Sequence, residues 1–395
     1  MSSLLKNIIR AFRTLLILSL DGILLLFHPS NVRDSRVLVV KIDAIGDFVI
    51  WLDAAKALCD HYHTQGYSVV LLGNKTWASW AREMGVAEEV WEIDVSRFRN
   101  YFPYRLHWLR RIRMAGFKIA IQPIFSRSIL EGDSLVRASG AVERLGSAGD
   151  DSNISPLFKA WSNRWYTRLI PATHIQLMEL KRNAEFMRGL GYTDFQARLP
   201  IIPRAPSEQI FWLPQQPYAV LVPTSSWDAK MWPIDNFIQV GGRLVASGLR
   251  IVVVGAPEDR VRASILIDSL SGRVVDLVGK TTLGELAEVM RRATIVLTND
   301  TSAVHIAAAV DAPAVCILGG GHFGRFVPYE IEVPDKNGNL PIIVAEPMSC
   351  YGCNWQCQYP RQKGEPMKCI QDISVQKVWD AVEMVLTKHS DQIAG

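Results

Sequence analysis

The chain has 395 residues, of which 49% are hydrophobic and 21% charged, which is enough for two cores of ordinary size and argues against a single domain. Its net charge of +4 and its pI near 8.7 are mildly basic, which fits an anionic ligand or a membrane surface as partner. The sequence contains no nucleic-acid-binding motif and no basic tail of the usual kind, so we expect no nucleic-acid partner.

The N-terminal segment, residues 1–30, is apolar but carries four charged residues that helical spacing places on one side: Lys6, Arg10, Arg13 and Asp21. This pattern predicts an amphipathic helix in the plane of a membrane interface. A spanning helix is disfavoured, because the uninterrupted apolar stretch is shorter than the roughly 20 residues that a bilayer needs. A secretory signal is also disfavoured, because Asp21-Gly22 interrupts the apolar core and no small-x-small cleavage site follows. An amphipathic helix packed on the protein or on a partner is the alternative.

The first strand of the globular part is residues 37–42, and residues 43–48, which include Gly46 and Asp47, follow it before a helical pattern that runs to Leu58. Ligands of open α/β sheets bind at the carboxyl ends of strands, so Asp47 lies where chemistry commonly happens. Gly46 lets a substrate approach the backbone. The alternative is that Asp47 only stabilises the dipole of the helix that it opens.

Strands and helices then alternate in the βαβ manner, which predicts parallel sheets and an α/β fold. In a first domain, residues 36–200, we expect further strands at 69–72, 90–93 and 119–121. The Gly-, Asp- and Ser-containing segment 141–156 is typical of a long loop. Three prolines, with Pro200 just before them, make residues 201–216 the best candidate for an interdomain linker.

A second domain, residues 217–370, repeats the alternation, and a helix from Val375 to Leu386 falls in the C-terminal part, residues 371–395. The expected strands are 219–222, 251–254, 274–277, 295–297 and 314–318. Polar residues follow the first of them: Thr224, Ser225, Ser226 and Lys230. Lys230 suits a leaving diphosphate as a point charge, since no Asp-x-Asp pair is present to hold a metal ion there. Without the other motifs, the alternative is that Lys230 is an ordinary surface lysine.

Residues 296–310 are the most informative stretch, because a buried apolar strand runs straight into the polar start of an apolar helix: Asn299, Asp300, Thr301, Ser302 and His305. Unpaired backbone N–H groups and the helix dipole favour a diphosphate at such a junction. Asp300 suits a sugar or ribose hydroxyl instead. A simple capped helix is the alternative.

Two further features stay open. Glu258 and Asp259 follow the strand 251–254, where they could contact the ribose or the base of a nucleotide. The alternative, which is the more common case, is that they are solvated carboxylates of a turn. The glycine-rich loop 319–324 has the composition of a loop that closes over a substrate.

Four cysteines lie within twenty residues, spaced x2, x3 and x11: Cys350, Cys353, Cys357 and Cys369. Grouped thiolates bind zinc or iron, and Cys-x2-Cys is a familiar metal hairpin, so a structural metal site is one prediction. Unmetallated, partly buried thiols are the alternative.

Together these motifs resemble glycosyltransferase family 9, the heptosyltransferase family of lipopolysaccharide synthesis, over roughly residues 36–370. The resemblance depends on Gly46-Asp47, on Lys230 with the Trp-Pro that follows one residue later, on the run 278–286, and on Asn299-Asp300-Thr301-Ser302 with His305. In one place the chain departs from the family pattern, which usually has glycine and then a proline or similar residue after the Asp-Ser/Thr pair, where this chain has Ser302-Ala303.

The resemblance implies the GT-B architecture, with two Rossmann-like domains facing a cleft. It implies that Asp47 is the catalytic base, that Lys230 holds the donor phosphates and that Asp300 meets the donor sugar. Thr301 and Ser302 would present donors to the diphosphate, with His305 beside it. The nucleotide base would lie near Gly279.

The implied reaction is inverting transfer of heptose from ADP-heptose to a lipopolysaccharide core or related glycolipid, with no cofactor required for catalysis. The implied location is the cytoplasm, peripheral on the inner face of the bacterial cytoplasmic membrane. Transfer of another nucleotide-activated sugar and a non-catalytic, membrane-associated binding subunit are the alternatives.

Overall fold

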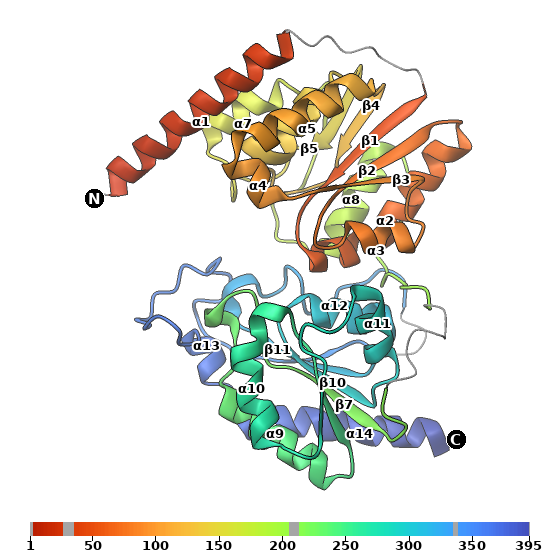
Figure 1. Cartoon of the computed structure of the whole chain (residues 1–395), viewed down its shortest axis with the longest axis vertical. Helices are drawn as coiled ribbons and strands as arrows, with labels where there is room; N and C mark the ends of the chain where they lie inside the picture. The colour runs from red at the N-terminus through yellow and green to blue at the C-terminus, as the bar shows by residue number, and fades with distance from the viewer. Residues whose placement is uncertain (1–2, 27–34, 205–212, 335–338, 395) are drawn as a thin grey trace. The chain divides into compact units, whose positions relative to one another are not determined.

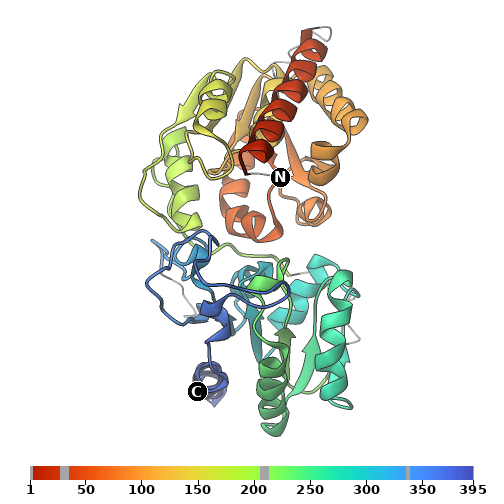
Figure 2. The same cartoon turned by 90° about the vertical axis from the view of Figure 1, so that its left-hand side faces the viewer.

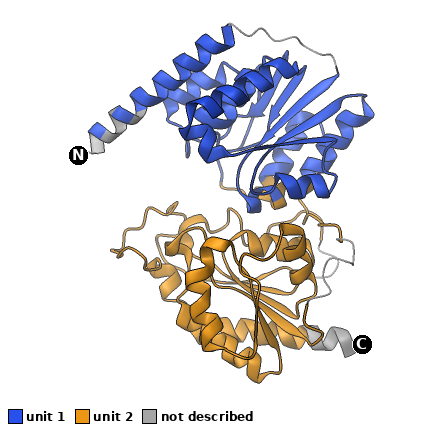
Figure 3. Cartoon of the chain, viewed as in Figure 1, with its two compact units in different colours: residues 1–48, 54–175, 182–195 blue, residues 49–53, 176–181, 196–395 orange. Residues whose placement is uncertain are grey.

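The computed structural model describes residues 3–26, 35–204, 213–334 and 339–394, and the chain divides into two compact units (Figure 3). Unit 1 is Met1–Phe48, Ala54–Ile175 and Arg182–Phe195, and unit 2 is Val49–Asp53, Gln176–Lys181 and Gln196–Gly395. Residues 205–212, half of the segment predicted as the linker, lie outside the described residues.

Unit 1 is built on a six-stranded parallel sheet in the order β3-β2-β1-β4-β5-β6 (Figure 1). The strands are β1 Arg36–Lys41, β2 Ser68–Asn74, β3 Glu89–Ile93, β4 Ile119–Gln122, β5 Glu143–Ser147 and β6 Arg168–Ile170. The helices are α1 Ser3–Leu26, α2 Ile45–Thr64, α3 Ala78–Glu83, α4 Val95–Asn100, α5 Phe102–Ala115, η1 Ile129–Asp133, α6 Ser134–Ser139, α7 Pro156–Asn163 and α8 Glu179–Leu190. The central strands β1 and β2 are almost wholly apolar and buried, as parallel strands covered on both faces are.

The prediction of a long loop over residues 141–156 is wrong, because β5 occupies Glu143–Ser147. Its sequence, ERLGS, contains a single large apolar residue, Leu145, so no apolar run marks it. The strand forms because β4 and β6 supply backbone hydrogen-bond partners on both sides.

Helix α1 is fastened to unit 1 by a buried ion pair. Arg105 Nε on α5 donates to Asp21 Oδ1 at 2.9 Å, and both side chains are 2% exposed. Asp21 therefore faces the protein together with Thr14 and Leu18, whereas Arg13 is exposed. Removal of one partner from a buried pair leaves an uncompensated charge, so loss of either side chain would destabilise the packing of α1 on unit 1.

The opposite side of α1 is exposed and apolar, and α1 lies along the outside of unit 1 (Figures 1 and 2). The exposed large apolar side chains are Leu5, Ile9, Phe12, Leu15, Leu16, Leu20, Ile23 and Leu26. Among the described residues, no helix combines the length and apolar character that a membrane crossing requires.

Unit 2 is a second six-stranded parallel sheet, in the order β12-β11-β10-β7-β8-β9. The strands are β7 Tyr218–Val222, β8 Arg250–Val253, β9 Val274–Asp276, β10 Ile295–Asn299, β11 Ala314–Ile317 and β12 Ile342–Val344. The helices are η3 Asp228–Lys230, α9 Ile234–Ala246, η4 Pro257–Asp259, α10 Arg260–Ser269, α11 Leu283–Arg291, α12 Ser302–Ala309, η5 Gly320–His322, α13 Lys368–Gln371 and α14 Val375–Ala394.

The core of unit 2 lies between its sheet and the helices α9 and α14, with Trp232 and Phe237 fully buried in it. Helix α14 is seen lengthwise in Figure 1 and end-on in Figure 2, and its buried Val378 and Val382 join this core.

Both sheets have the strand order of the doubly wound Rossmann fold, in which the first and fourth strands of each unit are neighbours. The chain leaves the first strand in one direction across the sheet and returns to the fourth on its other side. The switch points are between β1 and β4 in unit 1 and between β7 and β10 in unit 2. The predicted α/β fold with two doubly wound parallel sheets is confirmed.

Candidate active site

The switch point of unit 2 brings together two residues predicted from separate motifs. Lys230 follows β7 and Asp300 follows β10, and Lys230 Nζ lies 3.3 Å from Asp300 Oδ2. Ligands of such sheets bind outside the carboxyl ends of the strands at this point. Asp300 is only 7% exposed and Lys230 is half-buried, so the charges of the pair are poorly screened.

Asn299 joins the two loops that carry this pair. Its Oδ1 accepts the backbone N–H of Trp232 at 2.9 Å, and its Nδ2 donates to the carbonyl of Val222 at 3.3 Å. Asn299 has no exposed surface. A fully buried amide with partners on a neighbouring loop fixes the position of Lys230 relative to Asp300.

Helix α12 begins beside Asp300, with the backbone N–H groups of its first turn at the same edge of the sheet. Thr301 is its N-cap, and Thr301 Oγ1 accepts the N–H of Ala303 at 3.2 Å. Ser302 is the first helical residue and is half-buried. Thr301 therefore caps the helix, and the partial positive charge of the helix start lies beside Asp300.

The other predicted phosphate-site residues differ in accessibility. Thr224 is 3% exposed, Ser225 is half-buried and Ser226 is exposed. Gly279 has φ +71° and donates its N–H to the carbonyl of Gly255 at 2.8 Å. A Cβ on Gly255 would lie 3.4 Å from Thr224 Oγ1, so the turns after β7, β8 and β9 lie side by side.

The two turn carboxylates left open by the sequence are both found near that turn. Asp259 Oδ2 accepts the N–H of Ala256 at 2.7 Å, and Glu258 is exposed. This contact is the local capping role of a turn carboxylate.

His305 lies in the apolar interior of α12, where it is 4% exposed. Its Nδ1 is 2.6 Å from the hydroxyl of Tyr329. Burial lowers its pKa from 6.5 to about 4, because the charged imidazolium is disfavoured away from water; Asp300 acts in the opposite direction and Lys230 in the same direction. His305 is therefore a neutral hydrogen-bonding group at physiological pH.

We expect His305 to make the protein less stable as the pH falls from 6.5 to 4. In that window the unfolded chain takes up a proton at His305 and the folded chain does not, so unfolding is favoured by up to about 3 kcal/mol. Urea unfolding at pH 7 and at pH 4.5 measures the loss, which should be smaller in His305→Gln than in wild type. The exposed His107→Gln is the control. An equal loss in wild type and His305→Gln would contradict the prediction.

In unit 1, the turn from β1 to α2 places Asp47 in the first turn of the helix, where it is half-buried. Asn74 and Trp77 hold this turn. Asn74 Nδ2 donates to the carbonyl of Ile42 at 3.2 Å, and Trp77 Nε1 donates to the carbonyl of Asp43 at 3.0 Å.

Trp77 also contacts the residue after Asp47. Its ring stacks on that of Phe48 with centroids 4.1 Å apart and an interplanar angle of 5°. Asp47 is thus fixed by hydrogen bonds before it in the chain and by a stacked ring after it.

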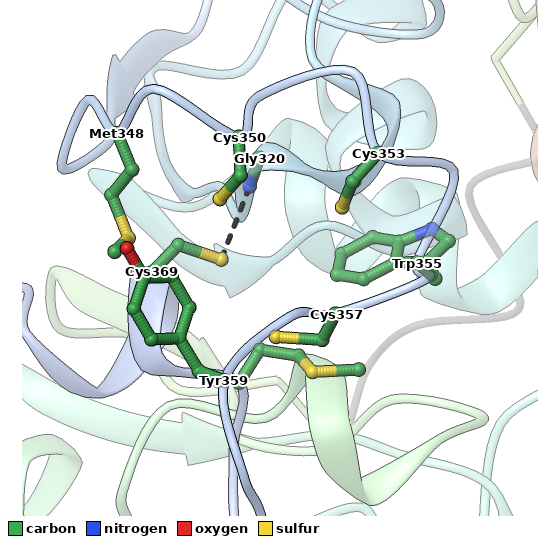
Figure 4. A pocket seen from close by; sticks show the side chains of 10 residues that line it. Gly320, Met348, Cys350, Cys353, Trp355, Cys357, Tyr359 and Cys369 are labelled. Carbon is green, nitrogen blue, oxygen red and sulfur yellow. Dashed lines mark hydrogen bonds between the residues drawn. The ribbon is translucent and has the colours of Figure 1, made fainter.

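The four cysteines of the C-terminal segment line one pocket with Gly320, Gly321 and Trp355 (Figure 4). The N–H of Gly320 points at Cys369 Sγ at 3.3 Å. In the part of the chain that the structure describes, no three Cys, His, Asp or Glu side chains form a group that could hold a metal ion. The thiols therefore share a pocket without forming a ligand set.

Sequence reasoning missed Asn74 and Trp77, which hold the turn that carries Asp47, and Trp355, whose ring centroid lies 4.6 Å from Lys230 Nζ. No single-residue signal marks them, because their partners are distant in the chain. One indirect signal is Gly73, where a Cβ would come within 2.6 Å of the Trp77 ring, so a large neighbour explains that glycine.

A model of a protein family, glycosyltransferase family 9 (heptosyltransferase), matches residues 135–334. Lipopolysaccharide heptosyltransferase 1 of Escherichia coli (strain K12) is 26% identical over 308 residues, which are 72% of this chain and 88% of that protein. The structure of the family 9 glycosyl transferase from Veillonella parvula DSM 2008 has a TM-score of 0.67 at 17% identity, covering 91% of this chain and 99% of the other. The structure of E. coli heptosyltransferase WaaC with ADP-2-deoxy-2-fluoro heptose has a TM-score of 0.59 at 20% identity, with coverages of 88% and 99%.

Proposed function

The chain belongs to glycosyltransferase family 9 and is a sugar-transferring enzyme, and we propose that it moves heptose from ADP-heptose to a lipopolysaccharide core or a related glycolipid. The observation that carries the proposal is the convergence of Lys230 and Asp300 beside the start of α12, at the switch point of unit 2. A cation and a helix N-terminus suit a diphosphate, and a carboxylate suits sugar hydroxyls. Relatives named as lipopolysaccharide heptosyltransferases support the choice of sugar and acceptor.

In the proposed mechanism each residue has one role. Asp47 accepts the proton of the acceptor hydroxyl, whose oxygen attacks the anomeric carbon while the bond to the nucleoside diphosphate breaks. Lys230 and the N–H groups at the start of α12 stabilise the negative charge that develops on the leaving diphosphate. Asp300 accepts hydrogen bonds from the sugar. Attack from the face opposite the leaving group inverts the anomeric configuration.

The donor assignment is tested by thermal-shift titration with ADP, UDP, GDP and dTDP, since a ligand that binds only the native state raises the apparent stability. Selective stabilisation by ADP is the expected result. Preference for another nucleotide would keep the transferase and contradict the heptose donor. No response to any nucleotide would favour the alternative of a non-catalytic binding subunit.

The apolar face of α1 supports a peripheral association with the cytoplasmic membrane, where a glycolipid acceptor resides. The exposed apolar side chains extend from Leu5 to Leu26, while the buried Asp21–Arg105 pair holds the opposite side of the helix against the protein. Contiguous exposed apolar patches on a protein surface are typical of interaction sites. A helix held in this way buries its outer side chains in the interface without crossing the bilayer.

We expect Phe12→Ser combined with Leu16→Ser to weaken binding to vesicles of anionic bacterial phospholipid by at least about tenfold, because two large side chains leave the apolar phase. Vesicle co-sedimentation measures the partition. The matched control is Leu157→Ser combined with Val261→Ser, which removes two side chains of 78% and 81% exposure outside α1. Equal binding of the two double variants would contradict a role for α1.

A structural metal at the four cysteines stays a prediction. Their shared pocket supports it, but their present positions do not form a ligand set among the described residues. Elemental analysis of the purified protein tests it. The prediction requires about one zinc or iron ion per chain, lost in Cys353→Ser combined with Cys357→Ser. If wild type contains neither zinc nor iron, the four cysteines are unmetallated thiols.

A further inference from the structure

The glycines that follow β11, Gly319–Gly321, pack against the cysteine-bearing segment Cys350–Cys357. Gly352 N–H donates to the carbonyl of Gly320 at 2.9 Å, and Asn354 N–H donates to the carbonyl of Gly321 at 3.0 Å. The segment Cys350–Cys357 thus lies directly on these glycines at the carboxyl end of the sheet of unit 2 (Figure 4). This stretch does not have the extended, uncovered form of a loop that closes over a substrate.

The glycines are required because aromatic rings occupy the space of their missing side chains. A Cβ on Gly321 would lie 2.2 Å from Cδ2 of Trp355, and a Cβ on Gly320 would lie 2.2 Å from Cδ1 of Tyr351. Trp355 and its neighbour Asn354 both have left-handed backbone conformations, with φ +62° and +48°. Two adjacent residues of this kind, one of them bulky, are strained and concentrate at functional positions.

The ring of Trp355 faces the lysine of the candidate donor site. Lys230 Nζ lies 4.6 Å from the centroid of the Trp355 ring. The ammonium group therefore has the Asp300 carboxylate as one partner and the indole face as another. A cation over an indole face is attracted by the negative face of the ring, and burial strengthens this attraction.

Two polar atoms beside this lysine are buried without a hydrogen-bond partner in the described part of the chain. They are Nε1 of Trp355 and Nδ1 of His322, and the centroids of the two rings are 5.6 Å apart. Trp355 Nε1 can only donate, so a bound ligand with oxygen acceptors removes the cost of leaving it unpaired. The oxygens of a diphosphate are such acceptors. His322 Nδ1 is an acceptor, because Nε2 of the same ring donates to Asn354 Oδ1 at 2.7 Å, and a ligand hydroxyl would satisfy it.

We infer that Trp355 is a residue of the donor diphosphate site, carried there by the cysteine-bearing segment, where its ring orients Lys230 toward the phosphates. The inference rests on the proposed function in taking a nucleoside diphosphate sugar as the donor. It connects the four-cysteine segment to the donor site through a side chain. Trp355 acts as a positioning residue for Lys230.

The test is calorimetric titration of the full chain with ADP, together with donor kinetics. Trp355→Leu removes the ring face and should weaken ADP binding on the order of tenfold, with a larger effect on the donor KM than on kcat. Trp355→Phe keeps an aromatic face and should restore affinity to within about threefold of wild type. A purely structural role would not separate the two variants in this way.

A pair of glycine variants tests the same point without touching the tryptophan. Gly321→Ala displaces the indole of Trp355 and should reproduce the loss of ADP affinity expected for Trp355→Leu. The two losses of affinity should not add in the double variant. Gly242→Ala on α9 is the matched control, because a Cβ there meets nothing within 4 Å.

Thermal melting without ligand reports whether each variant is folded. If Trp355→Leu is unfolded, Trp355→Phe and Gly321→Ala still decide the matter. Full ADP affinity in folded Trp355→Leu or Gly321→Ala, while Lys230→Ala loses it, would overturn the inference and leave the proposed function standing. Failure of wild type to bind any nucleoside diphosphate would overturn both.

Discussion

Asp47→Asn is expected to lower kcat by about 10²- to 10⁴-fold, because an asparagine cannot accept the proton of the attacking hydroxyl. The affinity for ADP should stay unchanged, since the residues proposed to bind the diphosphate belong to unit 2 and Asp47 belongs to unit 1. Steady-state kinetics with ADP-heptose and titration with ADP separate the two quantities. A large loss of turnover with intact nucleotide binding is the signature of a missing base.

Two other carboxylates sharpen this experiment. Asp53 lies in the same helix and pairs with Arg198 at 2.8 Å, so Asp53→Asn is the matched control and should retain turnover. Asp43 lies just before α2, and its Oδ2 is 2.6 Å from Lys41 Nζ. If Asp43→Asn abolishes turnover and Asp47→Asn does not, the base has been assigned to the wrong carboxylate.

A folding defect is distinguished by thermal melting. Asp47 interacts favourably with the dipole at the start of α2, which is worth about 0.3–1 kcal/mol, so Asp47→Asn should melt only slightly below wild type. Wild-type turnover in folded Asp47→Asn would show that Asp47 is not the catalytic base.

The positions of Lys230 and Asp300 could be predicted because each follows an apolar run that only a buried parallel strand explains. In a parallel sheet all carboxyl ends lie on one edge, so polar residues after such runs converge without any knowledge of the loops. The same reasoning placed Asp47 after β1. The fold class and the edge of the sheet that carries the candidate site can therefore be predicted from the local sequence pattern.

The features that escaped prediction depend on contacts between distant parts of the chain. β5 has one large apolar residue, and β6 and β12 have three residues each, so no periodicity identifies them. Asp21 pairs with Arg105, which is 84 positions away, and sequence spacing alone grouped it with solvent-facing charges. Likewise, nothing near Trp355 in the sequence indicates that it faces Lys230.

Lys230→Ala is expected to lower kcat by about 10²- to 10³-fold and to weaken ADP binding by at least about tenfold. The two effects have one cause, because the ammonium group attracts the diphosphate in the bound donor and attracts it more strongly as the leaving charge develops. The thermal shift caused by ADP in wild type should nearly vanish in the variant.

Removal of Lys230 also changes the free protein, because Asp300 is 7% exposed and loses its cation. A buried charge without its partner is destabilising, so Lys230→Ala should melt below wild type, whereas Lys230→Ala combined with Asp300→Asn should recover part of that loss. The recovery separates stability from function: the double variant regains melting temperature but not ADP affinity or turnover. If it regains affinity as well, the lysine serves only to neutralise Asp300, and the diphosphate is held elsewhere. Lys230→Arg keeps the charge and should retain part of the affinity, with less turnover because the planar guanidinium does not reproduce the position of the ammonium group.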